Sequence, residues 1–208
     1  MTENLYKDVA DYYAEKLAQF GQSAKGVDWN GEESQTLRFQ TLCKLIDQQE
    51  KFSINDIGCG YGSLYEFLKL KYNDFSYTGI DIAEDMISAA KERYSTFENA
   101  NFFVGAEPLR TQTYGLASGI FNVRLKFSES EWLKYIKETL DTLNNTSEKG
   151  FAFNCLTSYS DKEKMRDYLY YANPCELFDY CKRRYSKNVT LLHDYDLYEF
   201  TILVRKSI

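Results

Sequence analysis

The sequence predicts an α/β fold built on a doubly wound, mostly parallel sheet. From residue 52 onward, short apolar runs alternate with segments of helical spacing, which is the pattern of strands joined by crossover helices. The first run leads into a glycine-rich turn, DIGCGYGSL (56–64). The last two runs lie too close together for a crossover helix, so we expect them to pair as an antiparallel hairpin. The expected architecture is a Rossmann-like, seven-stranded sheet with a C-terminal antiparallel hairpin and an N-terminal helical cap.

Seven apolar runs are the predicted strands of this sheet. In chain order they read FSINDIG, FSYTGIDI, NFFVG, YGLASGIF, GFAFNCL, VTLLHDY and YEFTILV. Segments of helical character are expected between the first five, as parallel pairing requires. Only about two residues, Asp196 and Leu197, are expected to separate the last two.

Helix-start signals mark the connections later in the chain. The segment 128–131, SESE, has the spacing of a capping box and precedes apolar residues at helical intervals. A second start is expected at Ser160 with Glu163, and a third at Asn173 with Pro174 in the first helical position.

The N-terminal part has a different organisation. One helix is expected over residues 3–18 and a second is expected to open at Asn30 with Glu33, with the glycine-rich loop GQSAKGVDWNG between them. A chain of 208 residues with 44% hydrophobic content suffices for one well-filled core. We therefore predict a single domain, with residues 1–51 as a helical cap and 52–208 as the core.

Composition disfavours several classes of partner. With 25 basic and 31 acidic residues the net charge is -6, which opposes a large phosphate-binding surface and disfavours nucleic acid. No apolar run approaches the roughly 20 residues that span a bilayer, and the N-terminus lacks the pattern of a signal peptide. The five cysteines show no CxxC or Cys/His pairing. We expect no membrane partner, no metal, and a cytoplasmic protein with reduced, mostly buried thiols.

The glycine turn and a later acid together predict a nucleoside-binding site. Gly58, Gly60 and Gly62 let the backbone approach a ligand, but Ser63 stands where a dinucleotide fingerprint has its third glycine. Asp81 ends the second predicted strand, where a carboxylate can accept hydrogen bonds from both hydroxyls of a ribose. A Gly-Lys-Ser/Thr phosphate loop is absent from the sequence. The pattern therefore favours a ribose ligand over a nicotinamide cofactor or a bound triphosphate.

These two segments resemble a known family. DIGCGYGSL and TGIDIAEDMI are similar to the first and second motifs of the class I S-adenosylmethionine-dependent methyltransferases, of the small, stand-alone type that acts on small molecules. The resemblance covers about residues 52–208. It implies the same seven-stranded sheet, S-adenosyl-L-methionine as cofactor and transfer of its methyl group.

The resemblance also implies positions for the cofactor. The first motif would flank the methionine portion with Asp56, Gly58, Gly60 and Gly62. The second would supply Asp81 as the ribose acid and Ile82 and Met86 as adenine contacts. In the third motif, Gly105 is followed by Ala106 where the family often has an acid, so Glu107 is a substitute candidate for the adenine contact. In the fourth, LASGIFN, Ser118 would face the sulfonium.

The cap is a further candidate for the site. By likeness to small methyltransferases that cover the cofactor with an N-terminal segment, Trp29, Gln35 and Arg38 are expected to reach the cofactor or an acceptor carboxylate. An arginine can hold a carboxylate with two parallel hydrogen bonds. The alternative is that Trp29 is buried under the cap and Arg38 lies on a solvated helix face.

Candidate catalytic residues follow the later strands. A methyl group on a sulfonium is already activated, so a base is needed only for an acceptor with a proton of high pKa, such as an alcohol. His193 is the only histidine and stands beside Asp194; Tyr159 follows the fifth strand, and Tyr171 lies in DYLYYANP (167–174), a candidate lid. The alternative for each is a surface or packing role.

The predicted function is methylation of a small molecule at oxygen or nitrogen, with a hydroxyl or a carboxylate favoured as acceptor. The run after the fourth strand lacks the Pro-Pro-Tyr-like residues that accompany methylation of bases or protein amides in related families. Two alternatives stay open: a non-catalytic interaction protein with the same fold, and another transferase that uses S-adenosylmethionine, such as an aminopropyl transferase.

Overall fold

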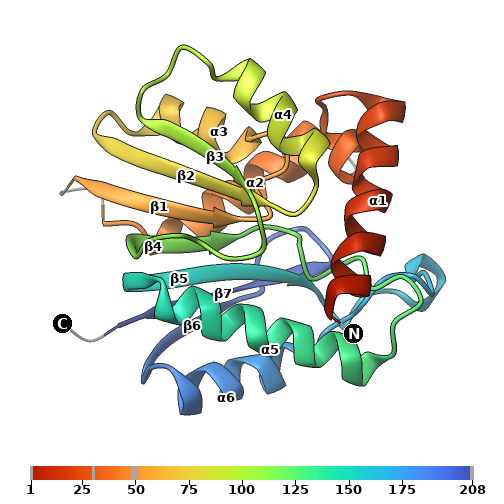
Figure 1. The fold of residues 1–208 in the computed structure, drawn as a ribbon. Helices are drawn as coiled ribbons and strands as arrows, with labels where there is room; N and C mark the ends of the chain where they lie inside the picture. Colours follow the sequence, from red (N-terminus) through yellow and green to blue (C-terminus); the bar gives the residue numbers. More distant parts are fainter. Residues whose placement is uncertain (1, 30, 48–50, 207–208) are drawn as a thin grey trace.

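A seven-stranded sheet forms the centre of the molecule in the computed structural model, which describes residues 2–29, 31–47 and 51–206 (Figure 1). The strand order is β3-β2-β1-β4-β5-β7-β6. The strands are β1 (Phe52–Ile57), β2 (Phe75–Asp81), β3 (Ala100–Val104), β4 (Gln112–Ala117), β5 (Ser147–Leu156), β6 (Asn188–Leu192) and β7 (Glu199–Arg205). The first five strands are parallel, and β7 runs antiparallel to both β5 and β6. The predicted fold class, including the C-terminal hairpin, is confirmed.

Helices cover both faces of the sheet. In Figure 1, α3 and α4 lie on one side of the sheet, α5 and α6 on the other, and α1 stands at one end of the strands. The α-helices are α1 (Thr2–Phe20), α2 (Glu32–Leu42), α3 (Ser63–Lys71), α4 (Glu84–Arg93), α5 (Glu129–Asn145) and α6 (Pro174–Arg184). Short 3-10 helices are η1 (Ala24–Val27), η2 (Cys43–Leu45) and η3 (Lys162–Lys164).

The two faces of the sheet pack into separate cores because neighbouring residues of a strand point in opposite directions. Phe151 and Phe153 of β5 belong to the core under α5 and α6, whereas Ala152 between them belongs to the core under α2 and α3. Trp132 of α5 is fully buried, and its indole nitrogen donates a hydrogen bond to the Phe121 carbonyl oxygen at 2.8 Å. Both cores therefore hold the strand ends in fixed positions.

The strand order reverses between β1 and β4, and this reversal places the site. The chain builds β1, β2 and β3 outward in one direction and then crosses back to β4 on the other side of β1. In such sheets a crevice opens at the carboxyl ends of the two strands that flank the reversal. Here these ends are Ile57 and Ala117, which are register partners.

The helix-start predictions had mixed outcomes. The capping box at 128–131 is confirmed at the start of α5, and α6 begins as predicted, with Asn173 as its cap and Pro174 in its first turn. The helix expected at Ser160 was wrong: only the single turn η3 forms, and none of its residues is buried, so no apolar face holds a longer helix.

Two connections of the sheet differ from the prediction. The connection between β3 and β4 contains no helix, contrary to the pattern of alternating units. The hairpin loop, residues 193–198, is longer than expected. The helix α2 begins at Glu32 with Gly31 as its cap; the predicted opening residue, Asn30, lies outside the described residues.

Two features are absent from the described part of the chain. None of the helices there is long and apolar enough to cross a membrane. Within the same residues there is no cluster of three or more His, Cys, Asp or Glu side chains suited to a metal ion. All five cysteines are free thiols, and only Cys175 is exposed.

Candidate functional site

The glycine turn joins β1 to α3 and is tied to the neighbouring strand. The amides of Gly58 and Cys59 both donate to the Ile80 carbonyl oxygen of β2, at 2.7 and 3.1 Å. Gly58 has a φ of +74°, and a Cβ there would collide with the side chain of Ile120. The turn thus requires glycine both for its backbone conformation and for its close packing.

Asp81, at the end of β2, holds this turn through hydrogen bonds. Its Oδ2 accepts a hydrogen bond from the Gly60 amide at 2.8 Å, and its Oδ1 accepts one from the Ala83 amide at 2.9 Å. Burial raises the pKa of the Asp81 carboxyl, and the backbone hydrogen bonds from Ala83 and Gly60 oppose that rise. The carboxylate is therefore held in one orientation at the carboxyl end of the sheet.

Asp56 is buried at the end of β1 and is only partly satisfied. The Tyr77 hydroxyl donates to its Oδ2 at 2.5 Å, while its Oδ1 has no hydrogen-bond partner within residues 2–29, 31–47 and 51–206. Burial raises the pKa of this carboxyl to about 7, although the Tyr77 hydrogen bond opposes the rise. A buried carboxylate oxygen without a donor is costly, so this atom is suited to a ligand that brings an N–H or a positive charge.

These elements surround one cavity, which we call the first cavity. Its walls come from the glycine turn, the ends of β1, β2 and β4, and the helices α1, α2 and α5. Ten of the thirteen residues predicted to bind the cofactor line it: Trp29, Asp56, Gly58, Gly60, Asp81, Ile82, Met86, Gly105, Ala106 and Ser118. The structure thus brings together residues that are up to 89 positions apart in the chain (Trp29 to Ser118, 118 − 29 = 89).

Three predicted cofactor residues do not line the first cavity. A Cβ on Gly62 would press on the rings of Tyr94 and Phe102, at 2.7 and 3.1 Å, so this glycine permits packing between α3 and its neighbours. Glu107 and Arg38 are also outside the lining. For these three, the structure does not favour the direct cofactor contact that the sequence suggested.

Other lining residues were missed from the sequence. Five of them belong to α1 and α5: Tyr6, Val9, Tyr13, Tyr135 and Thr139. The helical spacing of the N-terminus predicted α1 but gave no sign of which face meets the sheet. A tyrosine on a helix is more often a packing residue, so no signal marked these side chains.

A second cavity adjoins the first. The two share Tyr13, Val27, Trp29 and Gly119 as a common wall. The rest of the second cavity is lined mainly by the cap, the loop after β4 and residues 156–171, together with Tyr198 and Glu199: Asp28, Arg38, Asn122, Val123, Leu156, Ser160, Lys164, Arg166, Tyr168, Leu169, Tyr171, Tyr198 and Glu199. The indole of Trp29 packs tightly on Gly119, where an added Cβ would lie 2.8 Å from Trp29 Cζ2.

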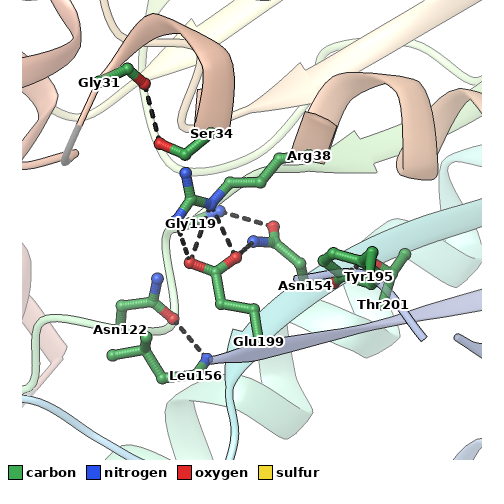
Figure 2. Close-up of polar contacts among 10 residues, drawn as sticks. All are labelled: Gly31, Ser34, Arg38, Gly119, Asn122, Asn154, Leu156, Tyr195, Glu199 and Thr201. Atoms are coloured by element: carbon green, nitrogen blue, oxygen red, sulfur yellow. Dashed lines mark hydrogen bonds and ion pairs between the residues drawn. The ribbon is translucent and has the colours of Figure 1, made fainter. Parts of the chain in front are cut away.

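A buried polar network forms one side of the second cavity (Figure 2). The Arg38 Nε donates to both carboxylate oxygens of Glu199 at 2.8 Å, and Nη2 donates to Oε1 at 2.5 Å. The Asn154 amide nitrogen donates to Glu199 Oε2 at 2.5 Å, and the Asn154 oxygen accepts from the Gly119 amide at 2.9 Å. This chain of contacts ties the cap helix α2 to the loop that walls both cavities.

Arg38 of α2 is buried, so it does not lie on a solvated helix face, which was the alternative to a role in the site. Its exposed fraction is 7%, and its guanidinium carbon lies 4.3 Å from the ring centroid of Trp29. The remaining nitrogen, Nη1, is buried and has no hydrogen-bond partner in the part of the chain that the structure describes. Gln35, the other cap residue of the prediction, lines the first cavity and donates to the Ser63 hydroxyl at 3.1 Å.

The predicted catalytic residues lie in different places. Tyr171 lines the second cavity, and its hydroxyl accepts a hydrogen bond from the Arg166 amide at 3.0 Å. His193 and Tyr159 line neither cavity. Their rings lie 5.8 Å apart beyond the ends of β6 and β5, and Tyr159 is 68% exposed. Because β6 is the edge strand of the sheet, this placement does not favour a catalytic role for His193 or Tyr159.

Similarity to known proteins agrees with this geometry. Residues 54–146 match the family model described as a methyltransferase domain. The chain is 57% identical over 164 residues to a protein of Mycobacterium tuberculosis (strain ATCC 25618 / H37Rv) named "Putative methyltransferase Rv1506c"; the match spans 79% of this chain and 99% of that protein.

Solved structures share the fold at low sequence identity. The complex of DhpI with SAH has a TM-score of 0.69 at 11% identity and covers 100% of both chains. The magnesium protoporphyrin IX methyltransferase ChlM of Synechocystis PCC 6803 with bound SAM has a TM-score of 0.56 at 12% identity, covering 84% of this chain and 77% of that one. The chain belongs to the class I S-adenosylmethionine-dependent methyltransferases.

Proposed function

We propose that this enzyme transfers the methyl group of S-adenosylmethionine to a small molecule, at an oxygen or a nitrogen, with a hydroxyl or a carboxylate as the favoured acceptor. The observation that carries the proposal is the second cavity, which shares a wall with the first and is lined by side chains that present both apolar surface and hydrogen-bonding groups. A concave site of this composition is typical of small-molecule binding.

The first cavity fits the cofactor in its chemistry. Two of its buried oxygens, Asp56 Oδ1 and Ser118 Oγ, have no partner among the residues described, and both can meet a donor on a ligand. Gly58 and Gly60 line this cavity without side chains, so their backbone can approach a ligand closely. We assign Asp56 and the glycine turn to the methionine portion, Asp81 to the ribose hydroxyls, and Ile82 and Met86 to the adenine.

When bound, S-adenosylmethionine supplies a methyl group on a positively charged sulfur. A nucleophile of the acceptor bonds to the methyl carbon as the carbon–sulfur bond breaks and S-adenosylhomocysteine is left. The protein's contribution is then to align the acceptor and to exclude water, and alignment alone can lower the barrier by about 7–11 kcal/mol. The shared wall of Tyr13, Val27, Trp29 and Gly119 lies between the two binding spaces and is suited to that alignment. The enzyme's only histidine lies elsewhere, which favours an acceptor that needs no histidine base, such as a carboxylate.

Product analysis by mass tests the proposal. The enzyme is incubated with S-adenosylmethionine and a panel of small hydroxy acids, carboxylic acids and amines, and Asp81→Ala serves as a matched inactive control. We expect at least one compound to gain the mass of one methylene as S-adenosylhomocysteine is released. Transfer of a radiolabelled methyl group only to the protein or nucleic-acid fraction of an extract would overturn the small-molecule assignment.

A further inference from the structure

We propose that the second cavity binds an acceptor that carries an anionic group, a carboxylate or a phosphate, held by Arg166 and Arg38. This inference rests on the proposed function and adds the charge class of the substrate to it. Three observations support it: the free charge of Arg166, the incomplete pairing of Arg38, and the balance of charges around the cavity.

Arg166 has no acidic partner within the described part of the chain. Its Nη1 donates to the carbonyl oxygens of Glu163 and Met165 at 3.1 and 2.9 Å, and these neutral groups leave its positive charge uncompensated. The amide of Arg166 is in turn fixed by the Tyr171 hydroxyl at 3.0 Å. An exposed guanidinium on the lining of a cavity, held by its own backbone contacts, is ready to form a paired contact with a carboxylate or phosphate.

Arg38 offers a second donor at the same cavity. Three of its contacts go to Glu199, but Nη1 is buried and has no partner among the described residues, as Figure 2 shows for the one guanidinium nitrogen outside the dashed contacts. A buried, unpaired donor costs free energy that a ligand oxygen would recover. The Trp29 ring centroid lies 4.3 Å from the guanidinium carbon, so an anion bound at Nη1 would lie close to the indole ring. Trp29 also belongs to the wall shared with the first cavity, which places this donor near the boundary between acceptor and cofactor.

The charges around the cavity favour an anion. Its lining holds three cations, Arg38, Lys164 and Arg166, and two anions, Asp28 and Glu199. Both anions are already paired, since Lys16 donates to Asp28 at 2.7 Å and Arg38 to Glu199. Lys164 also has an acidic partner, since its Nζ lies 3.5 Å from Asp161 Oδ2. The lining of the second cavity thus carries one more cation than anions, although the chain has a net charge of -6.

The two tryptophans provide a direct binding test. The enzyme has only Trp29 and Trp132, so its nitrogen-15 NMR spectrum contains two indole signals. Trp29 lines the second cavity, while Trp132 is buried in the core and serves as an internal reference. The protein, saturated with S-adenosylhomocysteine, is titrated at constant ionic strength with acetate, inorganic phosphate or the neutral acetamide.

We expect acetate or phosphate to move the Trp29 signal in a saturable way and to leave the Trp132 signal in place, while acetamide moves neither. The stronger of the two anions identifies the group on the acceptor. Arg166→Gln should weaken the effect at least fivefold, and Arg183→Gln, on the exposed face of α6, should not change it. Equal responses to acetate and acetamide, or equal affinities for the two arginine variants, would overturn the proposal.

An activity measurement separates this inference from the proposed function. Small acceptors are compared in pairs that differ only in a carboxylate and the corresponding carboxamide, with S-adenosylhomocysteine release as readout. We expect kcat/KM to be at least tenfold higher for the acids and Arg166→Gln to reduce that preference through KM. If the amides react as well as the acids, the anion site is wrong while small-molecule methylation stands. If no small acceptor reacts and macromolecules do, the proposed function fails as well.

Discussion

The two cavities differ in how their residues are distributed along the chain. More than half of the residues that line the first lie in the glycine turn or at and just after the ends of β2, β3 and β4, and most of the others come from the cap and α5. The second is built from long side chains of separate segments, such as Arg38 of α2, Arg166 of a loop and Glu199 of β7. A strand end constrains the first set directly, whereas the second depends on how the cap and the loops pack. The cofactor site can therefore be predicted from local sequence, and the acceptor site cannot.

The largest expected effect concerns the buried pair that supports the second cavity. Glu199→Ala leaves the Arg38 charge buried at 7% exposure without its partner, so we expect the free energy of unfolding to fall by about 3–5 kcal/mol. The matched control is Asp179→Ala, which removes the exposed partner of Arg183 and should cost less than about 1 kcal/mol. Urea denaturation of the two variants measures both values. Similar losses for both would show that the buried network does not stabilise the cap.

Gly58→Ala should act on the first cavity through strain. The substitution forces a positive φ on alanine and pushes a Cβ into Ile120, so we expect the unfolding free energy to fall by about 2 kcal/mol or more and affinity for S-adenosylhomocysteine to fall at least tenfold. Gly21→Ala separates the two causes, because Gly21 also has a positive φ of 64° but nothing lies within 4 Å of its added Cβ. This control should cost only about 1 kcal/mol and leave the affinity unchanged. Unaltered cofactor affinity in Gly58→Ala would contradict the role of the turn.

Asp56 predicts a dependence on pH that belongs to the first cavity. Burial raises its pKa from 3.8 to about 7, so the folded state holds the proton more tightly than the unfolded state. The resulting stabilisation is fully present below about pH 4 and is lost as the pH rises through about 7. Asp56→Asn cannot ionise, and it should therefore gain stability relative to the parent on going from pH 5 to pH 8, by about 1–3 kcal/mol. Denaturation curves at the two pH values test this; a difference that does not change with pH would refute it.

The smallest effect is expected at the residues outside both cavities. His193→Gln and Tyr159→Phe should leave kcat and KM within about twofold of the parent, because neither side chain lines a cavity and Tyr159 is 68% exposed. Steady-state methyl transfer with the acceptor found by the screen measures both constants. A large loss of kcat in His193→Gln would return the histidine to the mechanism and require the hairpin loop to move.

Much of the fold could be predicted because it depends on local signals. The capping box at Ser128 and the proline at Pro174 start helices through hydrogen bonds and dihedral angles within one turn, and both were found where the sequence placed them. The same kind of signal failed at Ser160, where the following residues have no apolar face to bury. A capping pattern starts a helix, but packing decides whether it continues.

The candidate site shows the same division. Asp81 and the glycines were expected near a ligand because strand ends converge at one edge of the sheet, and the structure places Asp81, Gly58 and Gly60 around one cavity. The pairing of Arg38 with Glu199 joins residues 161 positions apart, and no feature near either residue indicates it. Tyr6 and Tyr13 of α1 were missed because helical spacing does not show which face of a helix meets the sheet.

Calorimetric titration with S-adenosylhomocysteine of the parent, Asp81→Asn and Arg166→Gln tests most directly whether the two cavities have separate roles. We expect the parent to bind and Asp81→Asn to bind at least tenfold more weakly, a loss of about 1.4 kcal/mol at the ribose. Arg166→Gln should bind as the parent does, since Arg166 lines only the second cavity. If Asp81→Asn binds as tightly as the parent, or Arg166→Gln loses affinity to the same extent, the assignment of cofactor and acceptor to separate cavities is wrong.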